Sequence, residues 1–179
     1  MARGALAKIA IGLAVLGAVA SFAATASAAP GSPALSMAAL DQGVLTDINA
    51  FRTAHRLVPL RLSQQLSAAA LAHTQEMATD GYFAHTSADG AAFWKRVQRF
   101  YASSPWSYWS VGENLLWSSP DVDAAGALQL WLNSPEHRAN LMNPRWREIG
   151  VAAVHASAAP GVYKSLAVTI VTTDFGVRH

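Results

Sequence analysis

The chain has 179 residues, of which 52% are hydrophobic and 13% are charged, and its formal net charge is +2. This length suits one domain, or one domain with a processed segment, and allows a sizeable buried core. The sequence contains no cysteine, which excludes a disulfide scaffold, a thiolate zinc site and a cysteine nucleophile. Six tryptophans and six histidines are inconsistent with a wholly disordered chain.

Residues 1–28 have the pattern of a secretory signal peptide. Arg3 and Lys8 make the start positive, and the small residues Ala26-Ser27-Ala28 suit a signal peptidase. We therefore predict cleavage after Ala28. The uncharged stretch between these parts has about a dozen residues, fewer than the roughly 20 that span a bilayer. An uncleaved N-terminal anchor is the alternative.

Cleavage changes the charge of the chain. Removing Arg3 and Lys8 from the 13 basic residues leaves 11, equal to the 11 acidic residues. No Lys/Arg cluster longer than two remains, so nucleic acid is excluded as a partner. Export without cysteine is more typical of bacteria than of small eukaryotic secreted domains. We expect a bacterial protein that is secreted or associated with the cell envelope, with no transmembrane span after cleavage.

The first half of the remaining chain is predicted to be helical. Residues 29–36 are rich in Pro, Gly, Ser and Ala and are expected to form a flexible leader. Apolar residues at helical spacing predict a helix from Met37 to about His55. Ser63 suits the N-cap of a second helix that ends at Gly81. A short helix is expected around Ala92 to Tyr101. Its inward residues are predicted to be Phe93, Val97 and Phe100.

The second half mixes extended segments with two helices. Residues 111–117 are expected to be extended, and Ser119-Pro120-Asp121 to open a helix through Trp131. Ser134-Pro135-Glu136 repeats this signal for a short helix that ends near Asn143.

Two strands are predicted at the end of the chain. They cover about 148–155 and 162–173 and are joined by a hairpin loop at 156–161. This order predicts an α+β fold, with an antiparallel sheet between helical layers in one domain over 37–179.

Five segments occur in an order that resembles the CAP superfamily of cysteine-rich secretory and pathogenesis-related proteins. They are Gly81-Tyr82-Phe83-Ala84-His85-Thr86-Ser87 with Asp89-Gly90, Val111-Gly112-Glu113-Asn114-Leu115, Trp131-Leu132-Asn133-Ser134-Pro135-Glu136-His137-Arg138-Ala139-Asn140-Leu141-Met142, Glu148-Ile149-Gly150-Val151 and Thr173-Asp174-Phe175-Gly176. The chain is most similar to the cysteine-free bacterial SCP-domain branch, and the resemblance covers about residues 40–176.

The resemblance implies a three-layer α-β-α sandwich with a central antiparallel sheet. It also implies a groove with two histidines and two acidic residues, which holds a divalent metal in some family members. His85 and Glu113 match the first histidine and the first acid, His137 matches the histidine of the bacterial S-P-x-H-R motif, and Glu136 lies beside it. The late G-H-Y/F-T-Q histidine motif is absent, since residues 143–148 read N-P-R-W-R-E.

The residues themselves allow both functional and structural interpretations. His85 lies in a polar loop where core packing does not explain it, and imidazole can bind a metal or titrate near neutral pH. Glu113 lies in an apolar stretch, so its carboxylate needs a partner, either a groove histidine or a neighbouring loop. Glu136 is favoured at a helix N-terminus even without a site, whereas His137 there suits a neutral ligand or hydrogen-bond partner. His73 is expected to be a core histidine.

Three functions follow from these observations. The first is extracellular binding of a small apolar ligand, an envelope component or a protein through a groove formed by His85, Glu113, Glu136 and His137. The alternative is a metal-dependent hydrolase of peptide or cell-wall material, in which His85, Glu113 and His137 hold zinc or calcium. The third is a structural envelope domain. No hydrolase, P-loop or dinucleotide motif is present, so catalytic residues are not assigned.

Two tryptophans in a Ser/Pro-rich loop suggest a second surface feature. Trp106 and Trp109 are expected to form an exposed apolar rim, which is typical of a ligand or partner surface.

Overall fold

The computed structural model describes residues 36–179. The predicted signal peptide and residues 29–35 of the predicted leader lie outside the described residues. The helices described are α1 (Met37–Ala54), α2 (Gln64–Asp80), α3 (Phe93–Phe100), α4 (Ala124–Leu132) and α5 (Pro135–Leu141). The strands described are β1 (Arg61–Leu62), β2 (Trp109–Ser118), β3 (Glu148–Ala159) and β4 (Leu166–Arg178), with a 3-10 helix at Gly161–Tyr163.

The four strands form one sheet in the order β1-β3-β4-β2. The three long strands are antiparallel, as predicted, and β4 pairs along most of its length with both β2 and β3. β1 was not predicted, and it pairs in parallel with β3 at Arg61–Glu148 and Leu62–Ile149, which makes the sheet mixed. A strand of two residues is too short to show an alternating hydrophobic pattern. Only its pairing with β3 in the folded chain identifies it as a strand. β2 lies at the other edge of the sheet.

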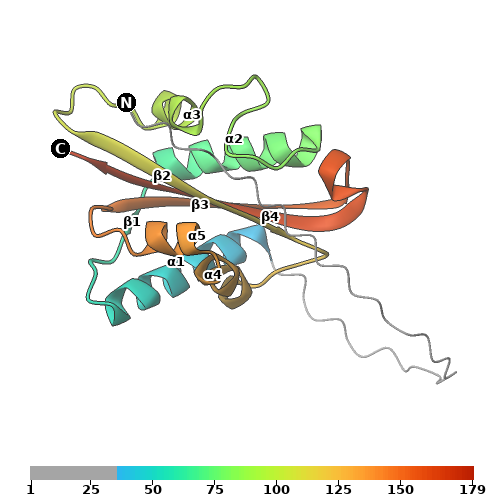
Figure 1. Cartoon of the computed structure of the whole chain (residues 1–179), viewed down its shortest axis with the longest axis horizontal. Coiled ribbons are helices and arrows are strands. Elements are labelled where there is room, and N and C mark those ends of the chain that lie inside the picture. The colour runs from blue at the N-terminus through green and yellow to red at the C-terminus, as the bar shows by residue number, and fades with distance from the viewer. Residues whose placement is uncertain (1–35) are drawn as a thin grey trace, which may run out of the picture. The chain divides into compact units, whose positions relative to one another are not determined.

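Helices cover both faces of the sheet (Figure 1). Neighbouring residues on β4 show the two faces, because side chains alternate along a strand. Val171 belongs to the core cluster with α1 and α4, whereas the Thr172 hydroxyl accepts a hydrogen bond from Thr74 of α2 at 2.7 Å. The α2 and α3 helices lie on one face, and α1, α4 and α5 lie on the other. This arrangement confirms the α+β class and the three-layer α-β-α sandwich.

The first two helices begin and end where the sequence predicts. The Ser36 side chain accepts from Ala39 N–H at the start of α1, and Ser63 accepts from Leu66 N–H at the start of α2. Gly81 ends α2 in the left-handed conformation, with φ of +72°. The Ser36 and Ser63 side chains thus satisfy backbone N–H groups that have no partner within the helix.

A glycine allows α2 to lie directly on the sheet. A Cβ atom at Gly150 of β3 would be 2.1 Å from the carbonyl carbon of Leu66, which no side chain allows. This close approach places α2 against β3, and the loop that follows α2 then reaches the edge strand β2.

The predicted start of α4 is wrong. The helix begins after Asp123, whose side chain accepts from Gly126 N–H at 2.7 Å, and not at Ser119. Ser119 instead donates its hydroxyl proton to the Ala167 carbonyl of β4 at 2.7 Å. This tertiary contact keeps Ser119 beside the sheet, and the helix starts only after the chain has left the sheet.

The predicted hairpin loop is also displaced. β3 continues to Ala159 through a register shift, and the turn uses residues 160–165, so both predicted strand ends were too early. The turn is held against the end of α2. Tyr163 is fully buried and donates to the Tyr82 carbonyl at 2.8 Å, and Val162 N–H donates to the Gly81 carbonyl at 2.9 Å.

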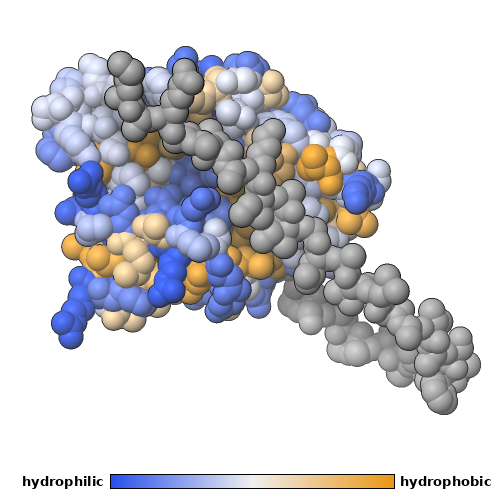
Figure 2. Space-filling model, viewed as in Figure 1, coloured by the Kyte–Doolittle hydropathy of each residue, from blue (hydrophilic) through white to orange (hydrophobic). Residues whose placement is uncertain are grey.

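Exposed aromatic residues are only partly as predicted. Trp106 is exposed, but Trp109 is half-buried and donates its indole N–H to the Tyr101 carbonyl at 2.9 Å. Phe100, which was predicted to point inward, is exposed, and the next residue, Tyr101, is buried in its place. On the face shown in Figure 2, hydrophobic residues lie in several separate patches among hydrophilic ones. Within residues 36–179, no helix combines the length and hydrophobicity that a bilayer span requires.

Candidate functional site

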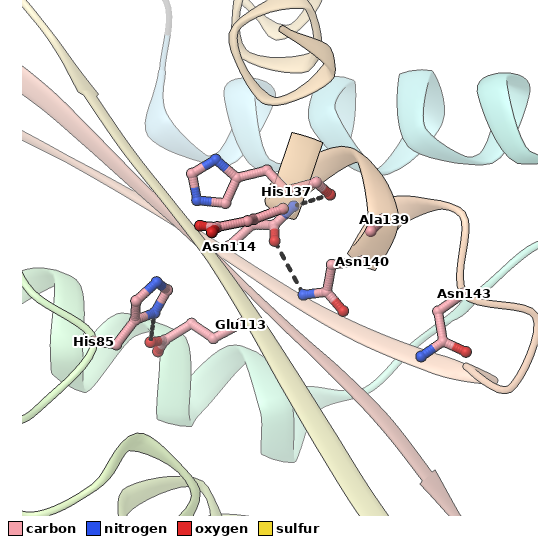
Figure 3. A pocket seen from close by; sticks show the side chains of 8 residues that line it. His85, Glu113, Asn114, His137, Ala139, Asn140 and Asn143 are labelled. Carbon is pink, nitrogen blue, oxygen red and sulfur yellow. Dashed lines mark hydrogen bonds and ion pairs between the residues drawn. The ribbon is translucent and has the colours of Figure 1, made fainter. Parts of the chain in front are cut away.

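An open cavity of about 350 Å³ lies at the outer edge of β2 (Figure 3). We call it the polar groove. It is lined by residues from β2, from the loop after α2 and from α5 with the turn that follows. The lining residues are His85, Glu113, Asn114, Glu136, His137, Ala139, Asn140 and Asn143. Tertiary folding thus brings all four predicted groove residues to one cavity.

The two sides of the polar groove come from opposite faces of the sheet. Glu113 and Asn114 are neighbours on β2, so their side chains point to opposite faces. Glu113 points toward the α3 side, where His85 lies in the loop after α2. Asn114 points toward α5, where its amide donates to the His137 carbonyl at 3.1 Å. The groove therefore spans the edge of the sheet, with His85 on one side and His137 on the other.

His85 and Glu113 form a direct contact. The Nδ1 atom of His85 lies 2.7 Å from Oε1 of Glu113, whose side chain is 1% exposed, whereas the His85 side chain is 51% exposed. Glu113 therefore fixes the ring in one orientation, with Nδ1 toward the carboxylate and Nε2 left for the groove. A histidine held this way by a buried carboxylate has a defined tautomer when neutral.

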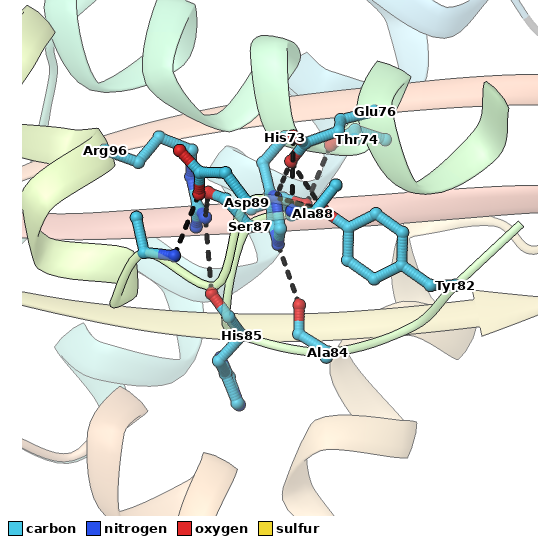
Figure 4. Close-up of polar contacts among 12 residues, drawn as sticks. His73, Thr74, Glu76, Tyr82, Ala84, His85, Ser87, Ala88, Asp89 and Arg96 are labelled. Atoms are coloured by element: carbon cyan, nitrogen blue, oxygen red, sulfur yellow. Dashed lines mark hydrogen bonds and ion pairs between the residues drawn. The ribbon is translucent and has the colours of Figure 1, made fainter. Parts of the chain in front are cut away.

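Arg96 belongs to the candidate site and was not predicted from the sequence. Its guanidinium is paired with Oε2 of Glu113, and both side chains are almost fully buried. The same guanidinium donates to the His85 carbonyl at 3.2 Å and to the Ser87 hydroxyl at 2.9 Å (Figure 4). Arg96 thus neutralises Glu113 and holds the loop that carries His85. The sequence does contain a signal for this residue. Arg96 lies three residues after Phe93 and one before Val97, so it falls on the apolar side of α3, where a charged side chain needs a partner.

A second carboxyl group lies beside this ion pair. Asp174 is opposite Glu113 in the β2–β4 register and is fully buried. Neither of its oxygens has a hydrogen-bond partner among the described residues. Burial, and then the negative charge of Glu113, raises the pKa of Asp174 well above its ordinary value. The neutral form of Asp174 is favoured, because Arg96 supplies only one positive charge to two carboxyl groups.

The His85 loop is also held from α2. His73 is fully buried, as predicted for a core histidine, and its Nε2 lies 2.9 Å from the Ala84 carbonyl (Figure 4). Glu76 accepts from the Tyr82 hydroxyl at 2.5 Å and from Ala88 N–H at 3.3 Å. These contacts bind the loop on both sides of His85, so the ring is presented from a fixed backbone.

The α5 side of the groove is organised by amide groups. Asn140 donates to the Asn114 side-chain oxygen at 3.0 Å and accepts from the Trp146 indole at 3.0 Å, so it ties α5 to β2. Pro135 is the first residue of α5, and Glu136 lies in its first turn, as predicted. Burial, and then the nearby His85, lowers the pKa of His137, which favours a neutral ring.

Replacing His137 with glutamine is expected to reduce the stability lost between pH 7 and pH 5. The folded-state pKa of His137 is lowered, so below about 6.5 the unfolded chain binds the proton more readily and folding stability falls. The variant lacks this loss. Asp41, whose pKa burial raises to about 6, and Asp174, whose pKa is also raised, are present in both proteins and cancel in the comparison. Urea unfolding at the two pH values measures the difference, and equal losses in both proteins would contradict the prediction.

The metal site implied by the resemblance does not fit the arrangement of these side chains. Within residues 36–179, no group of three His, Cys, Asp or Glu side chains is placed to hold an ion. In addition, both carboxylate oxygens of Glu113 already have a partner, one in His85 and one in Arg96. Zinc or calcium binding by His85, Glu113 and His137 requires Glu113 to leave one of these partners, and it stays a prediction.

An α-β-α sandwich with a groove of histidine and carboxylate at its sheet edge defines a class of domain, and sequence comparison identifies the class. Residues 45–172 match the sequence model of the cysteine-rich secretory protein family, CAP. The chain therefore belongs to the CAP family, as the five ordered segments indicated.

Two bacterial proteins are similar to this chain at 30% identity. The chain is 30% identical over 134 residues to the uncharacterized protein YkwD of Bacillus subtilis strain 168, covering 75% of this chain and 48% of YkwD. An extracellular protein containing a SCP domain from Bacillus anthracis superimposes with a TM-score of 0.56 at 30% identity, covering 83% of this chain and 44% of that one. The chain thus spans about half the length of these relatives.

A more distant structure shares the fold alone. An outer surface protein from Borrelia burgdorferi superimposes with a TM-score of 0.57 at 19% identity, over 77% of this chain and 92% of that protein. Two of these structural relatives are thus described as extracellular or outer-surface proteins.

Proposed function

We propose that this CAP domain is exported and acts outside the cell by binding a partner in the polar groove. The observation that carries the proposal is the hydrogen-bonding capacity left unused there. Among the described residues, Nε2 of His85, both ring nitrogens of His137 and the carboxylate of Glu136 have no hydrogen-bond partner. The cavity has the size of a ligand site, and converging polar groups fix the orientation of a bound ligand.

The lining selects among the predicted ligand classes. Seven of the eight lining residues have polar side chains, and Ala139 is the exception. An envelope component or a protein supplies hydrogen-bonding groups for these side chains, whereas a small apolar ligand leaves them unsatisfied. We therefore favour a polar envelope component or a protein as the ligand. The lining contains no serine, threonine or cysteine that would act as a nucleophile.

Co-sedimentation with purified bacterial cell walls tests the binding function. His85→Ala and His137→Ala are each expected to weaken binding at least about tenfold, because each leaves a polar group of the ligand without its hydrogen-bond partner. His55→Ala is the matched control, since His55 is exposed at the end of α1 and outside the groove. Equal binding by the wild type and both groove variants would show that the groove is not the binding surface.

The same samples distinguish the hydrolase alternative. Soluble fragments released from the walls by the wild type, and not by His85→Ala, would favour hydrolysis over binding alone. Calorimetry with zinc on the same proteins tests the metal: binding lost in both histidine variants would favour a metal site, and no binding in any of them would remove it.

A further inference from the structure

The polar groove contains backbone groups as well as side chains. β2 is an edge strand, so one side of its backbone pairs with β4 and the other faces away from the sheet. Just before the strand, Tyr108 N–H donates to the His179 carbonyl at 2.8 Å and His179 N–H donates to the Tyr108 carbonyl at 3.1 Å. Such doubly bonded pairs occur at every second residue of an antiparallel ladder.

This pair establishes the direction of each backbone group along β2. The β2–β4 register continues without interruption from Trp109 to Ser118. Even-numbered residues of β2 therefore bond to β4, and odd-numbered residues direct both N–H and C=O outward. An independent contact agrees: the outward carbonyl of Leu115 accepts from the Trp131 indole at 3.1 Å.

On the outer edge of β2, the backbone is hydrogen-bonded at Leu115 and, within the described part of the chain, unpaired at Val111 and Glu113. Trp131 of α4 covers the edge at the Leu115 carbonyl. Among residues 36–179, no hydrogen bond is made to the outward N–H or C=O of Val111 or Glu113. Glu113 lines the polar groove, and Val111 is half-buried two residues away. The unpaired part of the edge therefore reaches the groove at Glu113.

We propose that the polar groove binds an extended segment of another polypeptide, which pairs with Val111 and Glu113 as an added strand. A peptide backbone offers N–H and C=O groups at the same two-residue repeat, whereas a glycan chain does not. Alternate side chains of the added strand would face the His85 side and the His137 side. This inference rests on the proposed binding function and names the class of its ligand.

The experiment uses short linear peptides selected on the purified protein from a random phage-displayed library. Val111→Pro removes one outward N–H and places a ring in the path of the added strand, without touching the ladder to β4. Proline is tolerated on an edge strand where the N–H faces outward. Val111→Ala loses similar side-chain packing but keeps the N–H. We expect Val111→Pro to weaken the selected peptide at least about tenfold, and Val111→Ala to change it less than about threefold.

N-methylation of the peptide gives a second measurement that does not depend on a folded variant. Two methylated peptides are compared, one with methyl groups on the odd-numbered backbone nitrogens and one with them on the even-numbered nitrogens. Only one of these sets faces β2 in an added strand, so one peptide is expected to lose binding to the wild type and the other to keep it. Equal sensitivity of both alternations would overturn the added strand.

The outcomes separate this inference from the proposed function. If Val111→Pro is folded and binds the peptide like the wild type while His85→Ala and His137→Ala do not, the groove binds but the added strand is wrong. If no peptide is selected, the added strand is also wrong, and co-sedimentation with cell walls judges the groove separately.

Discussion

Replacing Trp131 with alanine is expected to lower the free energy of unfolding by about 3–5 kcal/mol, as for other large buried aromatic side chains. Trp131 is 1% exposed in the core cluster between α1, α4 and the sheet. Its indole N–H also donates to the Leu115 carbonyl, so the variant leaves both a cavity and an unpaired carbonyl at the edge strand. Urea denaturation followed by circular dichroism measures the loss.

Leu130→Ala is the matched control for this experiment. Leu130 is the preceding residue of the same helix and is 47% exposed, so its truncation is expected to cost less than about 1 kcal/mol. If Trp131→Ala lowered the free energy of unfolding as little as Leu130→Ala is expected to, Trp131 would lie outside the core. That result would contradict the sandwich described above.

Replacing Arg96 with alanine is expected to lower the free energy of unfolding by about 3–5 kcal/mol as well, here for an electrostatic reason. Removing one partner of a buried ion pair leaves an uncompensated buried charge, here Glu113, with a second carboxyl group of Asp174 beside it. The variant also frees the His85 loop from α3. Urea denaturation measures the cost.

Arg99→Ala on the same helix supplies the control. Arg99 and Asp89 form an exposed pair at 3.8 Å, which is expected to contribute no more than about 1 kcal/mol. In a Glu113→Gln background the cost of Arg96→Ala should shrink by about 0.5–3 kcal/mol, because no buried charge is left unpaired. Equal costs in both backgrounds would mean that Arg96 acts through packing and not through Glu113.

Local patterns in the sequence were sufficient for most of the elements. The periodicity after Met37, the Ser63 cap, the Gly81 stop and the Pro135 start each predict a boundary that the structure confirms. These signals work because caps and stops satisfy backbone groups within a few residues of themselves. The boundaries that failed depend on distant contacts. Ser119 is held by β4, and the turn after β3 is held by the end of α2.

In the site too, local motifs predicted some residues, whereas the contacts between them depend on the tertiary structure. The ordered family segments were sufficient to name His85, Glu113, Glu136 and His137, and Glu113 was correctly expected to need a polar partner. That this partner includes Arg96 depends on how α3 packs against the sheet. Residues 85, 113 and 137 are separated by more than 20 positions, so no local geometry places them together.

Only the tertiary structure shows that Asp174 is buried beside Glu113 and that β2 is the edge strand. Strand order follows from which long-range pairings form, and the hydrophobic pattern of a strand reports burial of its side chains without identifying its neighbours. The sequence thus determined which residue types are available to the groove. The packing of α2, α3 and α5 around an edge strand decided which of their atoms stay unpaired, because unpaired groups result from contacts that the fold makes elsewhere.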